Sequence, residues 1–135
     1  MDRLGRIVAA GLVVAGGAIH VKLYNDGYRK FPNANLGRSF LLNAAGALVV
    51  AVLLVAWRTR WSLLLAIGLV DATLVGFALS RTSSGIFGFT ETGFSPSPEA
   101  ALALVVEIGA AVVLTGLLAR ALPWRAGQAG PMISS

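Results

Sequence analysis

The sequence predicts an all-α protein, a four-helix transmembrane bundle of up-down-up-down topology with two longer aromatic loops on one side. Four apolar stretches, each about 20 residues long, match a hydrocarbon core about 30 Å thick at a rise of 1.5 Å per residue. Hydrophobic residues make up 56% of the 135 residues and charged residues only 13%, which is more apolar than ordinary soluble proteins. The eleven lysines and arginines lie almost wholly between these stretches or just beyond them.

The first predicted span covers residues 4–23. A signal peptide is the alternative for this segment, because a basic stretch at 1–6 precedes it and small residues at 15–17 would suit a peptidase. The apolar character continues through residues 19–23, however, which makes the segment long enough to cross the bilayer. A first transmembrane helix is therefore the favoured prediction.

The second and third predicted spans cover residues 38–57 and 61–80. Asn33 and Asn35 are both candidate N-caps for the second span, because asparagine side chains accept hydrogen bonds from the first free amides of a helix. The third span follows a short turn at 58–60, which is too brief for anything but an antiparallel neighbour.

The fourth predicted span covers residues 98–122. Ser97 offers an N-cap hydroxyl, Pro98 suits the first turn, and Glu99 places an acid at the positive end of the helix dipole. Pro123 stops the helix, because proline cannot continue it.

The predicted domain organisation is a single transmembrane domain at 1–124 and a flexible C-terminal tail at 125–135. Four crossings place both termini and the short turn on one side, and the loops at 24–37 and 81–97 on the other. Six lysines and arginines fall on the termini side and five on the loop side, with the termini side denser per residue. This bias predicts a multi-pass protein of the cell membrane with cytoplasmic N- and C-termini. An interfacial aromatic belt is expected on the termini side, formed by Trp57, Trp61 and Trp124.

Several classes of function have no support in the residues. The formal net charge of +5 comes from lysines and arginines that flank the spans, so it favours anionic headgroups and no nucleic-acid partner. The chain has no cysteine and one histidine, which removes disulfides, thiolate metal sites and a bis-histidine haem. We predict no metal, no cofactor and no catalytic residues, because the usual metal-ligand and enzyme motifs are missing.

Four polar side chains interrupt the predicted spans. An ionisable group at a helix centre costs about 2.5–3.5 kcal/mol on insertion scales, so each one needs an explanation. Each has glycine or alanine about one helical turn away, and small residues line the surfaces where membrane helices meet. The sequence therefore predicts an inward-facing candidate polar pocket of His20, Asn43, Asp71 and Glu107.

Two interpretations of these residues remain open. One interpretation is that they form interhelical hydrogen bonds, each contributing about 0.6 kcal/mol. The other interpretation is a pocket that opens to the loop side, where a carboxyl group kept neutral by desolvation exchanges a proton or holds a small ligand. The aromatic loops either anchor in the headgroups or cover the mouth of the pocket, with a candidate rim of Tyr24, Arg29, Arg81 and Glu91.

Four short motifs carry a resemblance. They are HVKLY at 20–24, GY at 27–28, FLLN at 40–43 and GIFGFTE at 85–91. With these motifs, nearly the whole chain resembles small four-span integral membrane proteins of actinobacteria, a group with no known function. The resemblance implies a membrane location and a bacterial origin.

Three functions are compatible with these observations. The first is a non-enzymatic membrane component in the lipid bilayer, as the subunit of a membrane-protein partner or as a homo-oligomer, and the sequence leans towards it. The second is a carrier or binding protein for protons or a small lipophilic ligand. The third is a membrane enzyme that uses His20 as an acid–base group.

Overall fold

The computed structural model describes residues 2–123. Trp124 and the tail predicted at 125–135 lie outside the described residues. Four long helices and one short 3-10 helix follow one another along the chain: α1 Asp2–Asp26, η1 Tyr28–Lys30, α2 Ala34–Ala56, α3 Arg60–Ser80 and α4 Glu99–Ala121.

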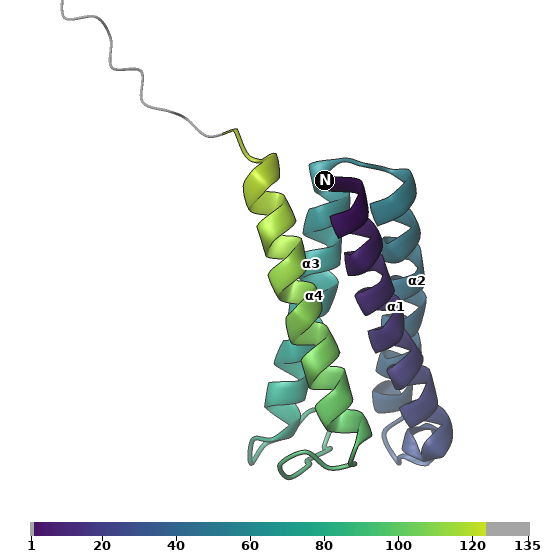
Figure 1. Cartoon of the computed structure of the whole chain (residues 1–135). Coiled ribbons are helices and arrows are strands. Elements are labelled where there is room, and N and C mark those ends of the chain that lie inside the picture. The colour runs from purple at the N-terminus through teal and green to yellow at the C-terminus, as the bar shows by residue number, and fades with distance from the viewer. Residues whose placement is uncertain (1, 124–135) are drawn as a thin grey trace, which may run out of the picture.

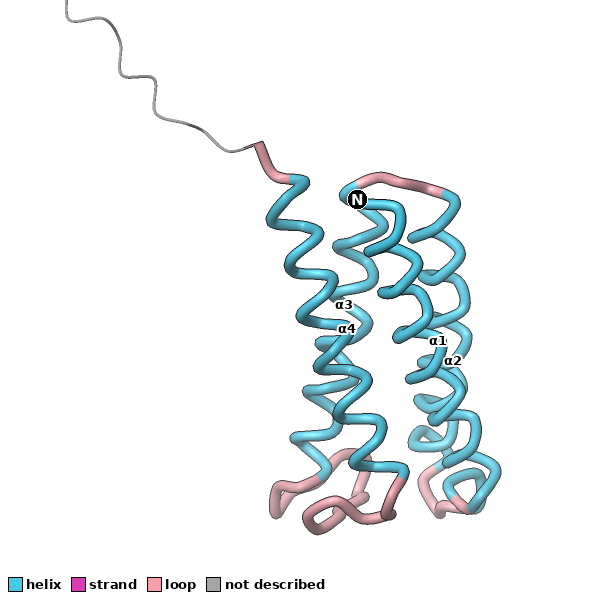
Figure 2. Tube along the Cα trace, viewed as in Figure 1, coloured by secondary structure: helices cyan, strands magenta, loops and turns pink. Residues whose placement is uncertain are grey.

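The four long helices form an antiparallel bundle, as predicted. Helix α1 packs against α2 and α4, and α3 packs against the same two neighbours, so α1 and α3 lie diagonally opposite each other. The N-terminus, the α2–α3 turn and the last residues of α4 lie at one end of the bundle (Figure 1). Figure 2 shows the two longer connections together at the other end.

Two helix boundaries differ from the predicted spans at the loop end. Helix α1 continues past Leu23 to Asp26, where the Asp26 carboxylate pairs with Lys22 one turn earlier. Helix α2 begins at Ala34 because Asn33 caps it: its side chain accepts a hydrogen bond of 3.0 Å from the amide of Asn35. The first connection is therefore shorter than the predicted loop.

The other two helices begin close to the predicted residues. The Thr59 side chain caps α3 by accepting a hydrogen bond from the amide of Ser62. Helix α4 begins at Glu99 with Pro98 in the N-cap position and no side-chain cap. The hydroxyl cap predicted from Ser97 is therefore wrong, and the acid in the first turn is the remaining stabilising signal at this end.

The bundle has a core of small and branched apolar residues and an outer surface of large ones. Fully buried positions include Ala9, Leu54, Ala66 and Leu114. Exposed leucines, valines and isoleucines cover the outside of all four helices. Each helix is long and apolar enough to cross a membrane, so the chain is a four-span integral membrane protein whose outer faces contact lipid.

Polar contacts tie the helices together at the termini end. The buried guanidinium of Arg6 donates to the Ser62 hydroxyl at 2.9 Å and to the Thr59 carbonyl at 3.0 Å. These bonds join α1 to the start of α3. Trp57 and Trp61 are exposed on either side of the same turn, where aromatic side chains favour the membrane interface.

Candidate functional site

A cavity of about 380 Å³ occupies the loop half of the bundle. We call it the loop-side cavity; all four helices and both loops contribute to its lining. Its volume falls within the range of about 300–1,000 Å³ found for small-molecule sites. Most of the lining is apolar, and the side chains that bring polar atoms are His20, Tyr28, Ser39, Asn43, Thr73, Arg81, Ser95 and Glu107.

The structure brings together three of the four polar residues that the sequence singles out. His20 on α1, Asn43 on α2 and Glu107 on α4 all line the loop-side cavity. Asp71 does not line it: this residue is exposed on the outer surface of α3, next to the buried Val70. The inward orientation predicted for Asp71 is therefore not observed.

Glu107 is the acid of the cavity lining, and it lies deep in the bundle. It lies about 12 Å along the axis of α4 from Glu99, the first residue of the helix, at 1.5 Å per residue. Its side chain is 5% exposed, and its carboxyl group accepts no hydrogen bond from any described residue. Every side-chain oxygen that is sealed off within the described residues has a partner. The carboxyl oxygens of Glu107 must therefore reach open space, which the cavity provides.

Gly16 on α1 makes room for this carboxyl group. A Cβ atom at position 16 would stand 2.5 Å from Oε1 of Glu107. That approach is far below van der Waals contact, so only glycine leaves the carboxyl group where it is. Helices α1 and α4 approach each other closely at this point because Gly16 has no side chain.

His20 is fixed by the same glycine. Nδ1 of its ring lies 2.8 Å from the carbonyl oxygen of Gly16. A carbonyl only accepts, so Nδ1 carries the proton and Nε2 of the neutral ring keeps a lone pair. The side chain is 9% exposed, and Nε2 has no partner among the described residues. Every side-chain nitrogen that is sealed off within the described residues has a partner. Nε2 therefore has accessible surface, and His20 lines the cavity.

Asn43 joins α2 to α3. Its side-chain nitrogen donates to the Thr73 hydroxyl at 2.5 Å, and that hydroxyl donates to the Leu69 carbonyl at 2.9 Å. Thr73 could not be predicted from the sequence, because its partner lies thirty residues earlier in the chain. The side-chain oxygen of Asn43 receives no hydrogen bond from the described residues.

A continuous row of rings connects the cavity with both loops. The ring of Phe40 lies 5.2 Å from that of His20 and 4.9 Å from that of Tyr28, measured between centroids. Phe89 of the second loop makes edge-to-face contacts with Tyr28 at 5.2 Å and with Phe31 at 5.3 Å. Such pairs stabilise by about 0.5–1.5 kcal/mol beyond their buried area. The two loops therefore pack on each other through Tyr28, Phe31 and Phe89, and Phe40 continues the row to His20. We call these five rings the aromatic row.

A tight turn in the second loop delivers Phe89 to this row. Ile86 and Phe89 exchange two backbone hydrogen bonds of 2.8 and 2.9 Å. The two residues between them, Phe87 and Gly88, have positive φ angles of 53° and 74°. This is the backbone of a primed hairpin turn, in which glycine is favoured at the second central position.

Arg81 and Glu91 fix the second loop to the rest of the molecule. The Arg81 guanidinium stacks 3.7 Å from the ring centroid of Phe77 and donates to the carbonyls of Gly93 at 3.1 Å and Ser95 at 2.9 Å. Burial lowers the pKa of Arg81 from its usual value, and the charge of Glu91 opposes this effect. Arg81 also lines the cavity, as the predicted rim requires.

Tyr28 connects the first loop with the second. Its hydroxyl donates to Oε1 of Glu91 at 3.1 Å. Burial raises the pKa of the Tyr28 hydroxyl well above its ordinary value, and the negative charge of Glu91 raises it further. Of the four predicted rim residues, Arg81 lines the cavity, whereas Tyr24, Arg29 and Glu91 do not. Tyr24 packs beside Gly37, and Arg29 is exposed.

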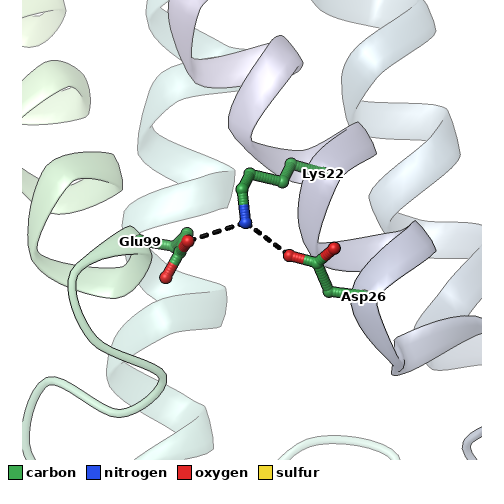
Figure 3. A network of polar contacts seen from close by, with 3 residues as sticks. All are labelled: Lys22, Asp26 and Glu99. Atoms are coloured by element: carbon green, nitrogen blue, oxygen red, sulfur yellow. Dashed lines mark hydrogen bonds and ion pairs between the residues drawn. The ribbon is translucent and has the colours of Figure 1, made fainter.

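An ion-pair network closes the loop end between α1 and α4. Lys22 lies 2.5 Å from Oδ2 of Asp26 and 2.7 Å from Oε1 of Glu99, as Figure 3 shows. Because Glu99 begins α4, the network holds the end of α1 against the start of α4. Lys22 does not line the loop-side cavity.

The cavity opens towards lipid between α2 and α3. Leu42 lines it while remaining 72% exposed, and the exposed Ala72 lines it from the facing helix. Gly76, one turn further along α3, also lines the cavity and has open space where a Cβ would stand. A molecule dissolved in the bilayer therefore meets an opening at the level of the loop-side leaflet.

No family model, curated protein or solved structure matches the chain. The resemblance to actinobacterial four-span proteins stays a prediction, as does the cytoplasmic location of the termini. The geometry itself establishes a four-span integral membrane protein with a largely apolar cavity at its loop end.

Proposed function

We propose that the protein binds a small lipophilic ligand in the loop-side cavity. The observation that carries this proposal is the Glu107 carboxyl group, which is buried, faces the cavity and has no partner among the described residues. A polar residue whose only role is to hold two helices together makes a hydrogen bond to another helix, as Asn43 does. An unpaired polar group in an apolar region costs several kcal/mol, roughly 2–7 by transfer measurements, and a bound ligand would offset that cost.

The surroundings of the cavity favour binding over passage through the membrane. Beyond Glu107, towards the termini end, Ala110 and Leu114 are fully buried at 0% exposure, together with Leu54. Close packing of this kind leaves no space for a molecule of the cavity's size. The ligand would enter from the bilayer between α2 and α3 and leave by the same opening.

A catalytic role for His20 has less support. Nδ1 of the ring is committed to the Gly16 carbonyl. This bond orients the ring and leaves Nε2 free to accept a proton, but no nucleophile or second acid–base group makes a hydrogen bond with the ring within residues 2–123.

Photolabelling in phosphatidylcholine nanodiscs tests the proposed site. The probe is an eight-carbon alcohol that carries a diazirine, and mass spectrometry of the digested protein locates the modified residues. Wild-type protein should be labelled saturably on cavity-lining residues such as Phe40 and Ala103. Gly76→Leu should reduce this labelling several-fold, because the new side chain would fill the open space at the cavity wall.

Gly116→Leu is the matched control for this experiment. Gly116 is exposed on α4 and also has open space at its Cβ position, but it does not line the cavity. Its labelling should equal that of the wild type. Labelling spread evenly over lipid-facing residues, or equal loss in both glycine variants, would exclude the cavity as a ligand site.

Assembly into a homo-oligomer is a second candidate, favoured by the position of Asp71. This acid is exposed halfway along α3, one turn from Gly68, whose Cβ position is empty. A carboxyl group that faces lipid at this depth is costly, and a neighbouring helix packed over it would remove it from the hydrocarbon. Lipid-phase crosslinking tests this: Asp71→Leu should abolish crosslinked dimers, whereas the lipid-facing substitution Val105→Leu should not. Equal dimer yields in both variants would refute the interface.

A further inference from the structure

The unpartnered polar atoms that face the loop-side cavity include three sets of hydrogen-bond acceptors. They are the carboxyl oxygens of Glu107, Nε2 of His20 and the side-chain oxygen of Asn43. Each lies on a residue of the cavity lining, and none receives a hydrogen bond from the described residues. The three residues come from three different helices, and all of them line the same cavity.

Apart from the hydroxyl of the exposed Ser95, the hydroxyl and guanidinium donors of the same lining are directed to other residues. The Tyr28 hydroxyl donates to Glu91, the Thr73 hydroxyl to the Leu69 carbonyl, and the Ser39 hydroxyl to the Leu36 carbonyl at 2.6 Å. Arg81 directs its guanidinium to carbonyls of the second loop and to Phe77. The unpaired acceptors of the cavity therefore favour a ligand that donates hydrogen bonds.

Two charged side chains line the cavity, the acid Glu107 and the cation Arg81, and the guanidinium of Arg81 is held by the second loop and Phe77. Glu107 forms no ion pair with Arg81 or with Lys22. The phenylalanine and tyrosine rings of the aromatic row that line the space are those of Phe40, Tyr28 and Phe89. Ring faces attract cations, most strongly where water is excluded. An anionic ligand would meet an unpaired acid here, and a neutral apolar ligand would leave that acid without a partner.

We infer that the ligand of this cavity is a lipophilic amine, bound as its ammonium ion with Glu107 as counter-charge. The inference rests on the proposed ligand site and specifies its chemistry. The ammonium group donates to the Glu107 carboxylate, with His20 Nε2 and the Asn43 oxygen as further acceptors. The apolar body of the amine fills the remaining lining and reaches the bilayer through the opening between α2 and α3.

Competition against the diazirine alcohol in phosphatidylcholine nanodiscs tests this assignment. The competitors are n-octylamine, octan-1-ol and octanoic acid, which share one chain length, with each concentration corrected for partition into the same nanodiscs without protein. Both octylamine and octanol can donate to the carboxylate, but only the ammonium adds an opposite charge, so octylamine should displace the label from wild-type protein at roughly tenfold lower concentration than octanol. Octanoic acid should be the weakest of the three.

Two variants separate binding to Glu107 from general attraction to the other acids of the loop end. Glu107→Gln keeps the shape of the side chain and should make octylamine and octanol equally effective, with labelling by the alcohol retained. Glu99→Gln removes an acid of the same helix that is paired with Lys22 outside the loop-side cavity. It should leave the preference for the amine unchanged.

The failures of the two proposals are distinguishable. Absence of saturable cavity labelling in wild-type protein would overturn the ligand site itself. Saturable labelling with octanol or octanoic acid as the better competitor would overturn the amine assignment and leave the site intact. An equal loss of amine preference in Glu99→Gln and Glu107→Gln would also overturn it. The wild-type comparison remains decisive if the Glu107 variant does not fold.

Discussion

Gly16 on α1 lies directly against the carboxyl group of Glu107 on α4, so that a Cβ at position 16 would stand 2.5 Å from Oε1. The carbonyl of the same glycine accepts the Nδ1 hydrogen of His20 at 2.8 Å. One residue without a side chain therefore sets the position of both ionisable groups of the loop-side cavity. The arrangement depends on α1 and α4 approaching closely at this depth.

Gly16→Ala should disturb the cavity more than the fold. The atom in the way is the far end of the flexible Glu107 side chain, which can turn aside, so the free energy of unfolding should change by less than about 1 kcal/mol. Saturable labelling of the cavity should fall several-fold. A large loss of stability in denaturant titrations with unchanged labelling would show that the contact is only packing.

Gly17→Ala should lower the stability of the fold more than it disturbs the loop-side cavity. A Cβ at position 17 would lie 2.8 Å from Cβ of Ala47 and 3.4 Å from Cα of Ala44. The backbone of α2 cannot turn aside, so the two helices must separate, at a cost of about 1–3 kcal/mol in the free energy of unfolding. Titration with dodecyl sulfate in mixed micelles measures this cost. Gly11→Ala on the same helix has open space and should be neutral; similar losses in both variants would contradict the explanation.

The bond between Asn43 and Thr73 should be worth little energy despite its position in the membrane. Comparable interhelical bonds average about 0.6 kcal/mol and reach about 1.7 kcal/mol in double-mutant cycles. A cycle of Asn43→Ala and Thr73→Val should give a coupling energy in this range, measured by the same unfolding titration. A coupling near zero would mean that this bond does not hold α2 to α3.

Much of the bundle could be predicted because the bilayer restricts the possibilities. Span length and apolar composition identified all four helices, and an asparagine cap marked the start of α2 at Asn33. His20, Asn43 and Glu107 were predicted to face inward from their small neighbours, and they line the cavity. The same rule failed for Asp71, since small residues such as Gly68 mark helix surfaces that meet another chain just as they mark those inside a bundle.

The aromatic row and the donors of the cavity could not be predicted in detail. Phe40, Tyr28 and Phe89 come from α2 and from two different loops, and nothing in their local sequence states that they will touch. The partner of Thr73 is equally distant in the chain. Such contacts depend on helix rotation and on the turn at Phe87 and Gly88, which sequence periodicity does not determine.

Tyr28 should ionise at unusually high pH. Its neutral hydroxyl is favoured in the folded protein, because burial and then the Glu91 carboxylate oppose the phenolate. The stabilisation is complete below the unfolded pKa of about 10 and is lost as the pH rises through the folded pKa. The absorbance of the wild type at alkaline pH, minus that of Tyr28→Phe, should rise only well above pH 10. A difference signal that titrates at the ordinary value would contradict the buried contact with Glu91.

The most direct measurement is the carboxyl ¹³C signal of Glu107 during ligand titration. The glutamates of the chain stand at positions 91, 99 and 107, so selective labelling of the glutamate carboxyl carbons gives few signals, and Glu107→Gln assigns the one that matters. When octylamine is added in nanodiscs, the Glu107 signal should shift saturably while those of Glu91 and Glu99 stay in place. A Glu107 signal that does not move, or one that moves no more than the other two, would contradict a ligand site built around this residue.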